Sequence, residues 1–258
     1  MKNAYAKICG IPELQQVQIH PETLQMIEAE QKSVLDFPLS GTIYGTMFNY
    51  AGTWEKQKEA FHQPPYQKPP EAPVLYIKPA NTFTGPNTNI PIPEEIEHVE
   101  IGACLGVVMK ENATQLTTEN AMSYVLGYTI VNDISIPHEN VHRPAIQQKA
   151  RDRFCAAGPW IMEKDSVPSP DALEIRVYIN GELCQHNSTV HLIRSISQLL
   201  VDVTEFMTLR KGDTLLVGIP DKPPLAKALD EVRIEIDTIG NLDNSFIKEQ
   251  AYVKEVQS

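Results

Sequence analysis

The chain has 258 residues, and its 33 Asp and Glu outnumber its 22 Lys and Arg, so its formal net charge is −11. This length is ample for a continuous hydrophobic core, in one large domain or two small ones. The negative charge argues against a nucleic-acid-binding protein, because such proteins carry basic surfaces. The sequence has no apolar run near the roughly 20 residues that span a bilayer, and its first residues lack a secretory signal. We therefore expect a protein that binds neither nucleic acid nor membrane.

The four cysteines are far apart in sequence and form no CxxC pair. Cys104 lies in an apolar run and Cys155 follows Phe154, so both are expected to be small core residues. A zinc site or a disulfide framework is therefore not expected, and a reducing cytoplasm fits this cysteine usage best.

Taken in chain order, residues 1–40 lack strong strand signals and are expected to form an N-terminal cap or extension of a body at 41–258. Helical spacing predicts helices over 23–34, 54–61, 118–125 and 190–207. Apolar runs predict more numerous strands, and Asn180-Gly181 predicts a hairpin turn. The predicted strands are 74–77, 101–109, 127–131, 160–162, 173–179, 214–217 and 232–236. These elements predict a β-rich α+β fold with few short helices.

The first polar stretch that could carry chemistry precedes an apolar strand. His98 and Glu100 are two residues apart, so on a strand they share one face. A buried charged pair there would be costly unless it were paired or bound to a metal. The spacing alone favours the simpler interpretation, which is an exposed strand end with solvated acids.

The second stretch begins at Asp133, which closes the apolar run YTIVN and precedes a loop that contains His138, Glu139, His142 and Arg143. Loops on a rigid scaffold often carry function, but an Asp at this position could equally cap a turn. The third stretch holds Lys149 and Asp152 before Gly158-Pro159. It could be a surface ion pair at helical spacing. Together the three stretches supply the carboxylates that bind Mg²⁺ or Mn²⁺ and a lysine that could help to hold an oxo-acid.

Three further segments carry a resemblance to a known family. The segments GYTIVNDIS, LRKGDTLLVGIP and DEVRIEIDTIGNLDNSFI resemble the fumarylacetoacetate hydrolase family in order and spacing, over about residues 41–247. The resemblance implies a mixed β-roll or sandwich, dependence on Mg²⁺ or Mn²⁺, and a homodimer or an assembly with a sibling subunit.

The resemblance also implies roles for individual residues. Glu100 and Asp133 match metal ligands of the family, and His98 stands where the family has a first Glu. Lys149 matches the active-site lysine, with Asp152 as the companion expected to orient it. Lys78 matches a lysine near the site entrance. Lys78 and Arg143 are expected to hold distal carboxylates of the substrate.

Other positions depart from the family pattern. Ile219 replaces the Thr of GTP, although the backbone of Gly218 remains available to the substrate. The segment that begins at Asn49 has Thr53 and Lys56 where several members have an acid/base His and Glu. We expect Asn49, Gly218 and Ile219 to line the substrate pocket. The loss of the His and Glu argues against hydrolysis, which needs a base to activate water.

Within the family, TWEKQKEAFHQPPYQKPPEAPVLYIKPANTFTG and HRPAIQQKARDRFCAAGP resemble members of 4-hydroxyphenylacetate catabolism. The implied reactions are decarboxylation of 5-oxopent-3-ene-1,2,5-tricarboxylate and isomerisation of 2-hydroxyhepta-2,4-diene-1,7-dioate, through an enolate that the metal stabilises. Two alternatives stay open. One is another oxo-acid activity of the family, such as acylpyruvate hydrolase or oxaloacetate decarboxylase. The other is a degenerate, non-catalytic partner of a catalytic sibling subunit.

Overall fold

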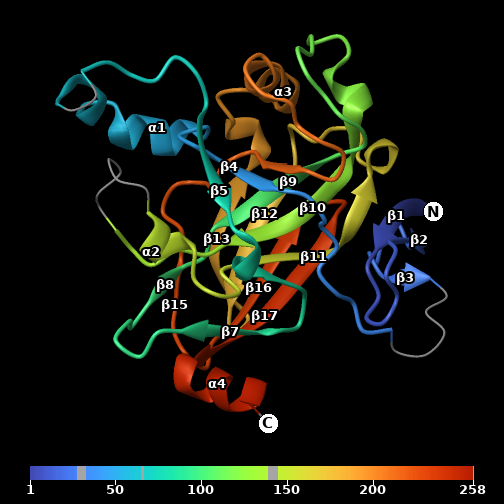
Figure 1. Ribbon diagram of the computed structural model, residues 1–258, viewed down its shortest axis with the longest axis vertical. Coiled ribbons are helices and arrows are strands. Elements are labelled where there is room, and N and C mark those ends of the chain that lie inside the picture. Colours follow the sequence, from blue (N-terminus) through green and yellow to red (C-terminus); the bar gives the residue numbers. More distant parts are fainter. Residues whose placement is uncertain (28–32, 65–66, 139–144, 258) are drawn as a thin grey trace.

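The computed structural model describes residues 1–27, 33–64, 67–138 and 145–257, and Figure 1 traces its elements. Most of its regular structure is strand, as predicted, in a ten-stranded sheet, a five-stranded sheet and a two-stranded ladder. The ten-stranded sheet has the order β3-β2-β1-β11-β10-β9-β14-β4-β5, and β6 also pairs with β11. The five-stranded sheet has the order β13-β12-β16-β17-β7, and β15 pairs with β8. The β-rich α+β class is therefore confirmed.

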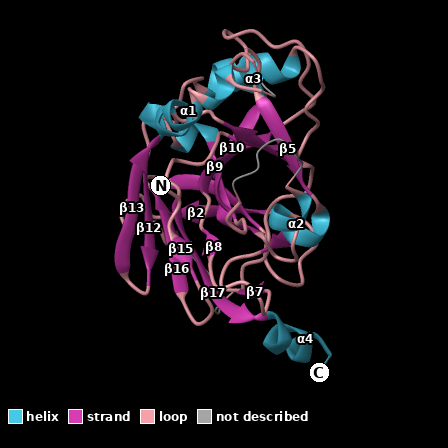
Figure 2. Cartoon of the chain, turned by 90° about the vertical axis from the view of Figure 1, so that its left-hand side faces the viewer, coloured by secondary structure: helices cyan, strands magenta, loops and turns pink. Residues whose placement is uncertain are grey.

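The strands have the following bounds: β1 (Lys2–Ala6), β2 (Gln15–Ile19), β3 (Met26–Ile27), β4 (Ile43–Met47), β5 (Val74–Lys78), β6 (Phe83–Thr84), β7 (Asn89–Ile92), β8 (Val99–Glu100), β9 (Ala103–Met109), β10 (Val125–Asp133), β11 (Cys155–Glu163), β12 (Glu174–Ile179), β13 (Glu182–Ser188), β14 (Thr214–Leu216), β15 (Leu225–Ala226), β16 (Glu231–Ile236) and β17 (Gly240–Lys248). The α-helices are α1 (Ala51–Gln57), α2 (Ile146–Lys149), α3 (Ile196–Thr204) and α4 (Glu249–Gln257). Figure 2 shows α1 and α3 at one end of the sheets and α4 at the other. No described helix is long and apolar enough to cross a membrane.

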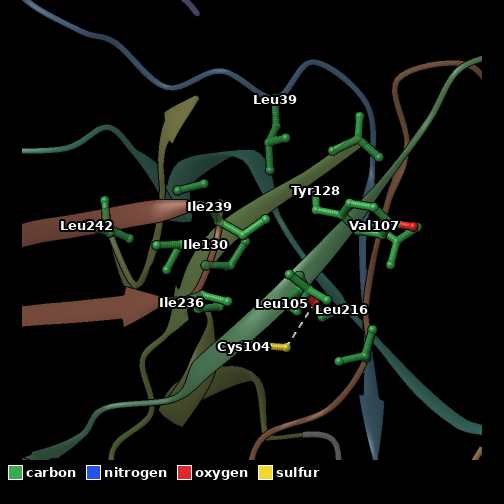
Figure 3. Close-up of a cluster of buried hydrophobic side chains, with 14 of the residues drawn as sticks. Leu39, Cys104, Leu105, Val107, Tyr128, Ile130, Leu216, Ile236, Ile239 and Leu242 are labelled. Atoms are coloured by element: carbon green, nitrogen blue, oxygen red, sulfur yellow. Dashed lines mark hydrogen bonds between the residues drawn. The ribbon is translucent and has the colours of Figure 1, made fainter. Parts of the chain in front are cut away.

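The main hydrophobic core lies between the two large sheets (Figure 3). Leu105 of β9 and Ile130 of β10 meet Ile236 of β16 and Leu242 of β17, and all four are buried. Successive residues of a strand point to opposite faces, so Cys104 and Asp133 project from the face of the ten-stranded sheet opposite to that of Leu105 and Ile130. Truncation of such a core side chain to Ala typically costs about 2–5 kcal/mol of the free energy of unfolding.

All seven predicted strands are present, with ends shifted by a few residues. The predicted hairpin is also confirmed, because β12 and β13 are joined at Asn180 and Gly181, whose φ angles are 53° and 82°. Such positive values suit a tight two-residue turn and explain why Asn and Gly occupy it. Cys104 and Cys155 are buried free thiols, as predicted.

The helices are shorter than their sequence periodicity predicted. In the segment 190–207, the side chain of Ser195 accepts a hydrogen bond from the backbone N–H of Gln198, and this N-cap starts α3 at Ile196. The segment 54–61 overlaps α1 and a 3₁₀ turn at Ala60–His62, and 118–125 holds only a 3₁₀ turn at Ala121–Tyr124.

The predicted helix over 23–34 is wrong in its described part, because Met26–Ile27 pairs with β2 as β3. Residues 28–32 lie outside the described residues. The first 40 residues contain three strands rather than a region without them, and β1 pairs with β11 through Ala4↔Met162 and Tyr5↔Ile161. The residues of β2, QQVQI, contain no apolar run that would predict a strand, because an antiparallel strand with one face in solvent needs only one apolar face.

The ten-stranded sheet must curl strongly. Strand β5 lies four places from β10 in the strand order, and in a flat sheet that separation would be about 19 Å, or four spacings of ~4.8 Å. Side chains of β5 nevertheless contact the last residue of β10, Asp133. The curl therefore brings the ends of β5 and β10 together, and the candidate site lies at this meeting point.

Candidate functional site

Asp133 is the centre of the site. Its backbone N–H donates to the carbonyl oxygen of Gly102 at 2.9 Å, and its side chain is fully buried. Nζ of Lys78 lies 2.8 Å from Oδ1, and Nζ of Lys149 lies 3.1 Å from Oδ2. The hydroxyl of Tyr76 donates a hydrogen bond to Oδ2. We call Tyr76, Lys78, Asp133 and Lys149 the lysine–aspartate cluster.

The electrostatics of the cluster favour an ionised carboxylate. Burial alone would raise the pKa of Asp133, but the positive charges of Lys149 and Lys78 and the hydrogen bonds from Lys78 and Tyr76 lower it to about 2. Burial, followed by the negative charge of Asp133, raises the pKa of Tyr76 well above its usual value. Tyr76 is therefore a neutral hydrogen-bond donor at physiological pH.

The family resemblance implied that Lys78 lies near the site entrance, but the structure places it in the interior. Its side chain is fully buried, and three oxygen atoms surround Nζ: Oδ1 of Asp133 at 2.8 Å, the carbonyl of Lys149 at 2.7 Å and the carbonyl of Ile134 at 3.4 Å. An ammonium group has three protons to donate. Lys78 therefore has no donor left for a substrate carboxylate, and it joins β5, β10 and α2 instead.

Lys149 is the more exposed lysine of the cluster. It ends α2, and 18% of its side chain is exposed. Its Nζ contacts Oδ2 of Asp133 and lies 5.0 Å from the ring centroid of Tyr76, within the range of a cation–π contact. Because Asp133 is the partner of only one of its three protons, the ammonium can also bind an anion. The catalytic role predicted for Lys149 stays a prediction.

Tyr76 was not predicted as a site residue. It lies on β5 two residues before Lys78, so both side chains point to one face of the sheet. Its ring fits there because Gly45 stands opposite it on β4, where a Cβ atom would overlap the ring. The two-residue spacing from Lys78 was the available signal, but only the register with β4 explains why the ring has room.

Glu100 and His98 lie beside this cluster on the chain that enters β9. The backbone of Glu100 pairs with Ser135 in both directions, at 2.8 and 3.3 Å. Among the described residues, none makes a hydrogen bond or ion pair with the Glu100 carboxylate. Nε2 of His98 lies 3.2 Å from Oε1 of the exposed Glu97, and its Nδ1 is buried without a partner in the described part of the chain.

The predicted metal ligands do not form a three-ligand site. No group of three His, Cys, Asp or Glu side chains among the described residues lies close enough to hold a metal ion. Each oxygen of Asp133 already contacts a lysine ammonium, and His98 is directed to Glu97. A divalent cation needs several free oxygen ligands. The arrangement of Glu100, Asp133 and His98 therefore does not fit Mg²⁺ or Mn²⁺.

Asp152 forms a hydrogen bond with Asn81 rather than with the Lys149 side chain. Its Oδ1 accepts a hydrogen bond from Nδ2 of Asn81 at 2.9 Å, and the same amide donates to the carbonyl of Ala150 at 2.9 Å. The backbone N–H of Arg153 in turn donates to the carbonyl of Asn81 at 3.1 Å. Asp152 and Asn81 thus fix the turn after α2, and they position Lys149 through the backbone rather than by direct contact.

The predicted pocket residues divide into structural and site-facing ones. Asn49 is buried and its amide is fully used: Nδ2 donates to the carbonyls of Val217 and Arg194, and Oδ1 accepts from the Arg194 N–H. Asn49 therefore has a structural role instead of the predicted contact with substrate. Its partners fix the backbone next to Gly218, which has a φ of 126°. Ile219 does reach the site, because its Cδ1 would lie 2.9 Å from a Cβ atom at Gly102, beside the Asp133 carbonyl.

Arg143 lies outside the described residues, so its predicted contact with a substrate carboxylate stays a prediction. A hollow of about 720 Å³ is present on another part of the molecule, lined by residues of β12, β16 and β17 such as Tyr178, Arg233 and Asp243. Its ion pair between Arg233 and Asp243 is a surface contact of a sheet. Of the hollow and the lysine–aspartate cluster, only the cluster contains fully buried charges, so we take the cluster as the candidate functional site.

Comparison with known proteins identifies the family of the chain. A family model described as fumarylacetoacetate (FAA) hydrolase C-terminal matches residues 42–247. The chain is 36% identical over 212 residues to the 4-hydroxyphenylacetate degradation bifunctional isomerase/decarboxylase of Escherichia coli. The matched region covers 82% of this chain and 48% of that protein. The chain belongs to the fumarylacetoacetate hydrolase family. It spans about half the length of the curated relatives that it matches.

Solved structures share the fold. A 5-carboxymethyl-2-hydroxymuconate delta-isomerase from Mycobacterium smegmatis is 25% identical and superposes with a TM-score of 0.76, over 96% of this chain and 99% of that one. A maleylpyruvate hydrolase from Sphingobium sp. SYK-6, solved in complex with manganese(II) and pyruvate, is 23% identical with a TM-score of 0.68, over 84% of this chain and 75% of that one. The chain thus shares its fold with these structures, and one of them was solved in complex with manganese(II) and pyruvate.

Proposed function

We propose that this chain is an enzyme of aromatic catabolism that stabilises the enolate of an unsaturated oxo-acid. The proposed reactions are decarboxylation of 5-oxopent-3-ene-1,2,5-tricarboxylate and isomerisation of 2-hydroxyhepta-2,4-diene-1,7-dioate. The name of the E. coli relative supports this choice of pathway and chemistry. The observation that carries the proposal is the partly exposed Lys149 ammonium, held by the fully buried carboxylate of Asp133.

Both reactions pass through the same dienolate. In the decarboxylation, the C–C bond to the carboxylate on C2 breaks, and its electron pair moves through the conjugated double bond to the oxygen of the ketone. Carbon dioxide leaves, and the enolate oxygen then takes a proton to give the 2-hydroxydiene. In the isomerisation, the hydroxyl loses a proton and C5 gains one, which leaves a 2-oxo-3-ene.

Lys149 suits the step that both reactions share. A preorganised ammonium beside the oxygen where charge develops stabilises the transition state more than the ground state. Lys149 would donate a hydrogen bond to the enolate oxygen and deliver its proton. The carboxylate of Glu100, which has no partner among the described residues, is our candidate base for the hydroxyl proton in the isomerisation. The apolar side chain of Ile219 would cover the conjugated carbons.

The family implies a Mg²⁺ or Mn²⁺ ion, and such an ion would polarise the ketone. The described residues offer no three-ligand site for either metal. The steps above therefore use side chains of the protein alone.

The test is turnover by the purified chain. The tricarboxylate is incubated with the protein, and release of carbon dioxide is measured together with ultraviolet absorbance of the hydroxydiene. We expect both signals from the wild type and a loss of at least about 100-fold in Lys149→Met, since a positioned acid typically contributes 10²–10⁴-fold. Equal rates in the wild type and the variant would contradict the assignment of Lys149.

A second candidate function follows from the departures at the predicted metal ligands. A chain that spans about half of its relatives and carries His98 in place of a carboxylate could serve as the non-catalytic partner of a sibling subunit. Activity of the isolated chain separates the two candidates. Turnover by this chain alone supports the enzyme, and turnover only after addition of the sibling subunit supports the partner.

A further inference from the structure

The charges around Asp133 set this chain apart from a metal-dependent site. A carboxylate that ligates a divalent cation must turn at least one oxygen to the ion. Here Oδ1 contacts the ammonium of Lys78 and Oδ2 contacts both the ammonium of Lys149 and the hydroxyl of Tyr76. The two ammonium groups balance the one carboxylate and leave the lysine–aspartate cluster with a net charge of +1.

We infer that the two lysines of the cluster take the place of a divalent cation, so that Asp133 anchors Lys149 as the group that binds the carboxylate or enolate oxygen of an oxo-acid. This inference deepens the proposed function and rests on it for the identity of the substrate. The part of the inference that concerns metal binding can be tested without measuring turnover.

Lys78 and Lys149 have different roles in this arrangement. Lys78 is fully buried and donates all of its protons within the protein, so it is a positioning residue. Its contact with the carbonyl of Lys149 at 2.7 Å fixes the end of α2 above Asp133. Lys149 keeps part of its side chain exposed and has protons to spare for an anion.

The Asp133 side chain has no exposed surface through which an ion could reach it directly. Nearby, the Tyr76 ring lies against Gly45, and the Ile219 side chain lies near Gly102. An approaching divalent ion would have to displace an ammonium group and would then be repelled by both lysines. A small anion meets the opposite situation, because the cluster presents one partly exposed positive group to it.

The first experiment measures metal binding without substrate. Mn²⁺ is added to the purified chain, and bound ion is quantified by electron paramagnetic resonance of the free ion and by calorimetry. We expect no stoichiometric binding by the wild type at up to about 1 mM Mn²⁺. One ion per chain in the wild type, lost in Glu100→Gln or Asp133→Asn, would overturn the inference. The variant Glu100→Gln keeps this outcome readable if Asp133→Asn fails to fold, because Glu100 is only partly buried.

The second experiment measures anion binding in the presence of EDTA. Oxalate, a non-reactive analogue of the oxo-acid end, is titrated into the wild type, Lys149→Met and the control Lys110→Met, in which an exposed lysine at the end of β9 is replaced. We expect binding by the wild type and the control, and at least tenfold weaker binding by Lys149→Met. Oxalate binding that requires added Mn²⁺, or no binding at all, would overturn the assignment.

The outcomes distinguish this inference from the proposed function. Lys149-dependent oxalate binding in EDTA by a chain that turns over neither proposed substrate would support the inference and contradict the function. Turnover that requires Mn²⁺ bound by the wild type would support the function and contradict the inference.

Discussion

Lys78 and Asp133 form an ion pair in which neither side chain is exposed, with Nζ 2.8 Å from Oδ1. The pair joins the last residue of an edge strand to the last residue of a central strand in the same curled sheet. Taking two charges out of water is costly, and the pair is tolerated because Lys149, Tyr76 and two backbone carbonyls complete its hydrogen bonds. This relationship determines what the site can do.

Replacement of Lys78 by Met should destabilise the protein strongly. It removes one of the two ammonium groups from a fully buried carboxylate, and breaking a buried pair costs about 3–5 kcal/mol. Urea denaturation of the wild type and the variant measures this change. The matched control is Lys58→Met, which removes an exposed ion pair with Glu55 and should cost less than about 1 kcal/mol. Equal losses in the two variants would contradict the structural role of Lys78.

The stability that Asp133 contributes should depend on pH in the acid range only. Its folded-state pKa of about 2 lies below the ordinary value of 3.8. A depressed carboxyl pKa stabilises the folded state above the unfolded-state pKa, and this contribution of roughly 2 kcal/mol is lost as the pH falls from about 4 through 2.

The measurement for this prediction is the free energy of unfolding of the wild type and of Asp133→Asn from pH 7 to pH 2. The difference in the free energy of unfolding between the wild type and Asp133→Asn should stay constant down to about pH 4.5 and become smaller below that value. A difference in the free energy of unfolding that widens as the pH falls from 7 to 5 would show that the carboxyl group has a raised pKa instead.

The variant Tyr76→Phe should separate the hydroxyl of Tyr76 from its ring. The ring keeps its place against Gly45, but Asp133 loses a hydrogen bond, and a bond to a charged group contributes about 1.5–3 kcal/mol. Thermal denaturation should therefore show a lower melting temperature. Gly45→Ala is the companion variant, because its added Cβ would overlap the ring and should disturb the site even with the hydroxyl present.

Loss of Asn81 should lower turnover without a contact to substrate. Asn81 holds Asp152 and the carbonyl of Ala150, and thereby the backbone that carries Lys149. In Asn81→Ala we expect kcat to fall about tenfold with a smaller change in KM, because a displaced Lys149 weakens stabilisation of the transition state. The conservative variant Asn81→Gln, which retains an amide, should recover part of the rate. Full activity in Asn81→Ala would contradict this positioning role.

The sequence by itself determined the strands, the hairpin and the family. Apolar runs of three to nine residues and the Asn180-Gly181 turn are local signals, which favour strands and a hairpin turn. The resemblance around NDIS, and around the lysine that precedes GP, likewise selected Asp133 and Lys149. Helix ends and the first strands were harder to predict, because a cap at Ser195 and a half-polar strand at Gln15–Ile19 depend on their neighbours.

Only the tertiary structure decided which charges meet. The sequence suggested Lys78 for the site entrance, Asn49 for substrate and a three-ligand metal site. The curl of the ten-stranded sheet instead brings the end of β5 onto Asp133, where Lys78 is buried and Tyr76 completes the cluster. Such contacts join strands that are distant in the chain and four places apart in the sheet. Their energy depends on burial and on the partners of every donor, and these are properties of the folded sheet that no local pattern of residues carries.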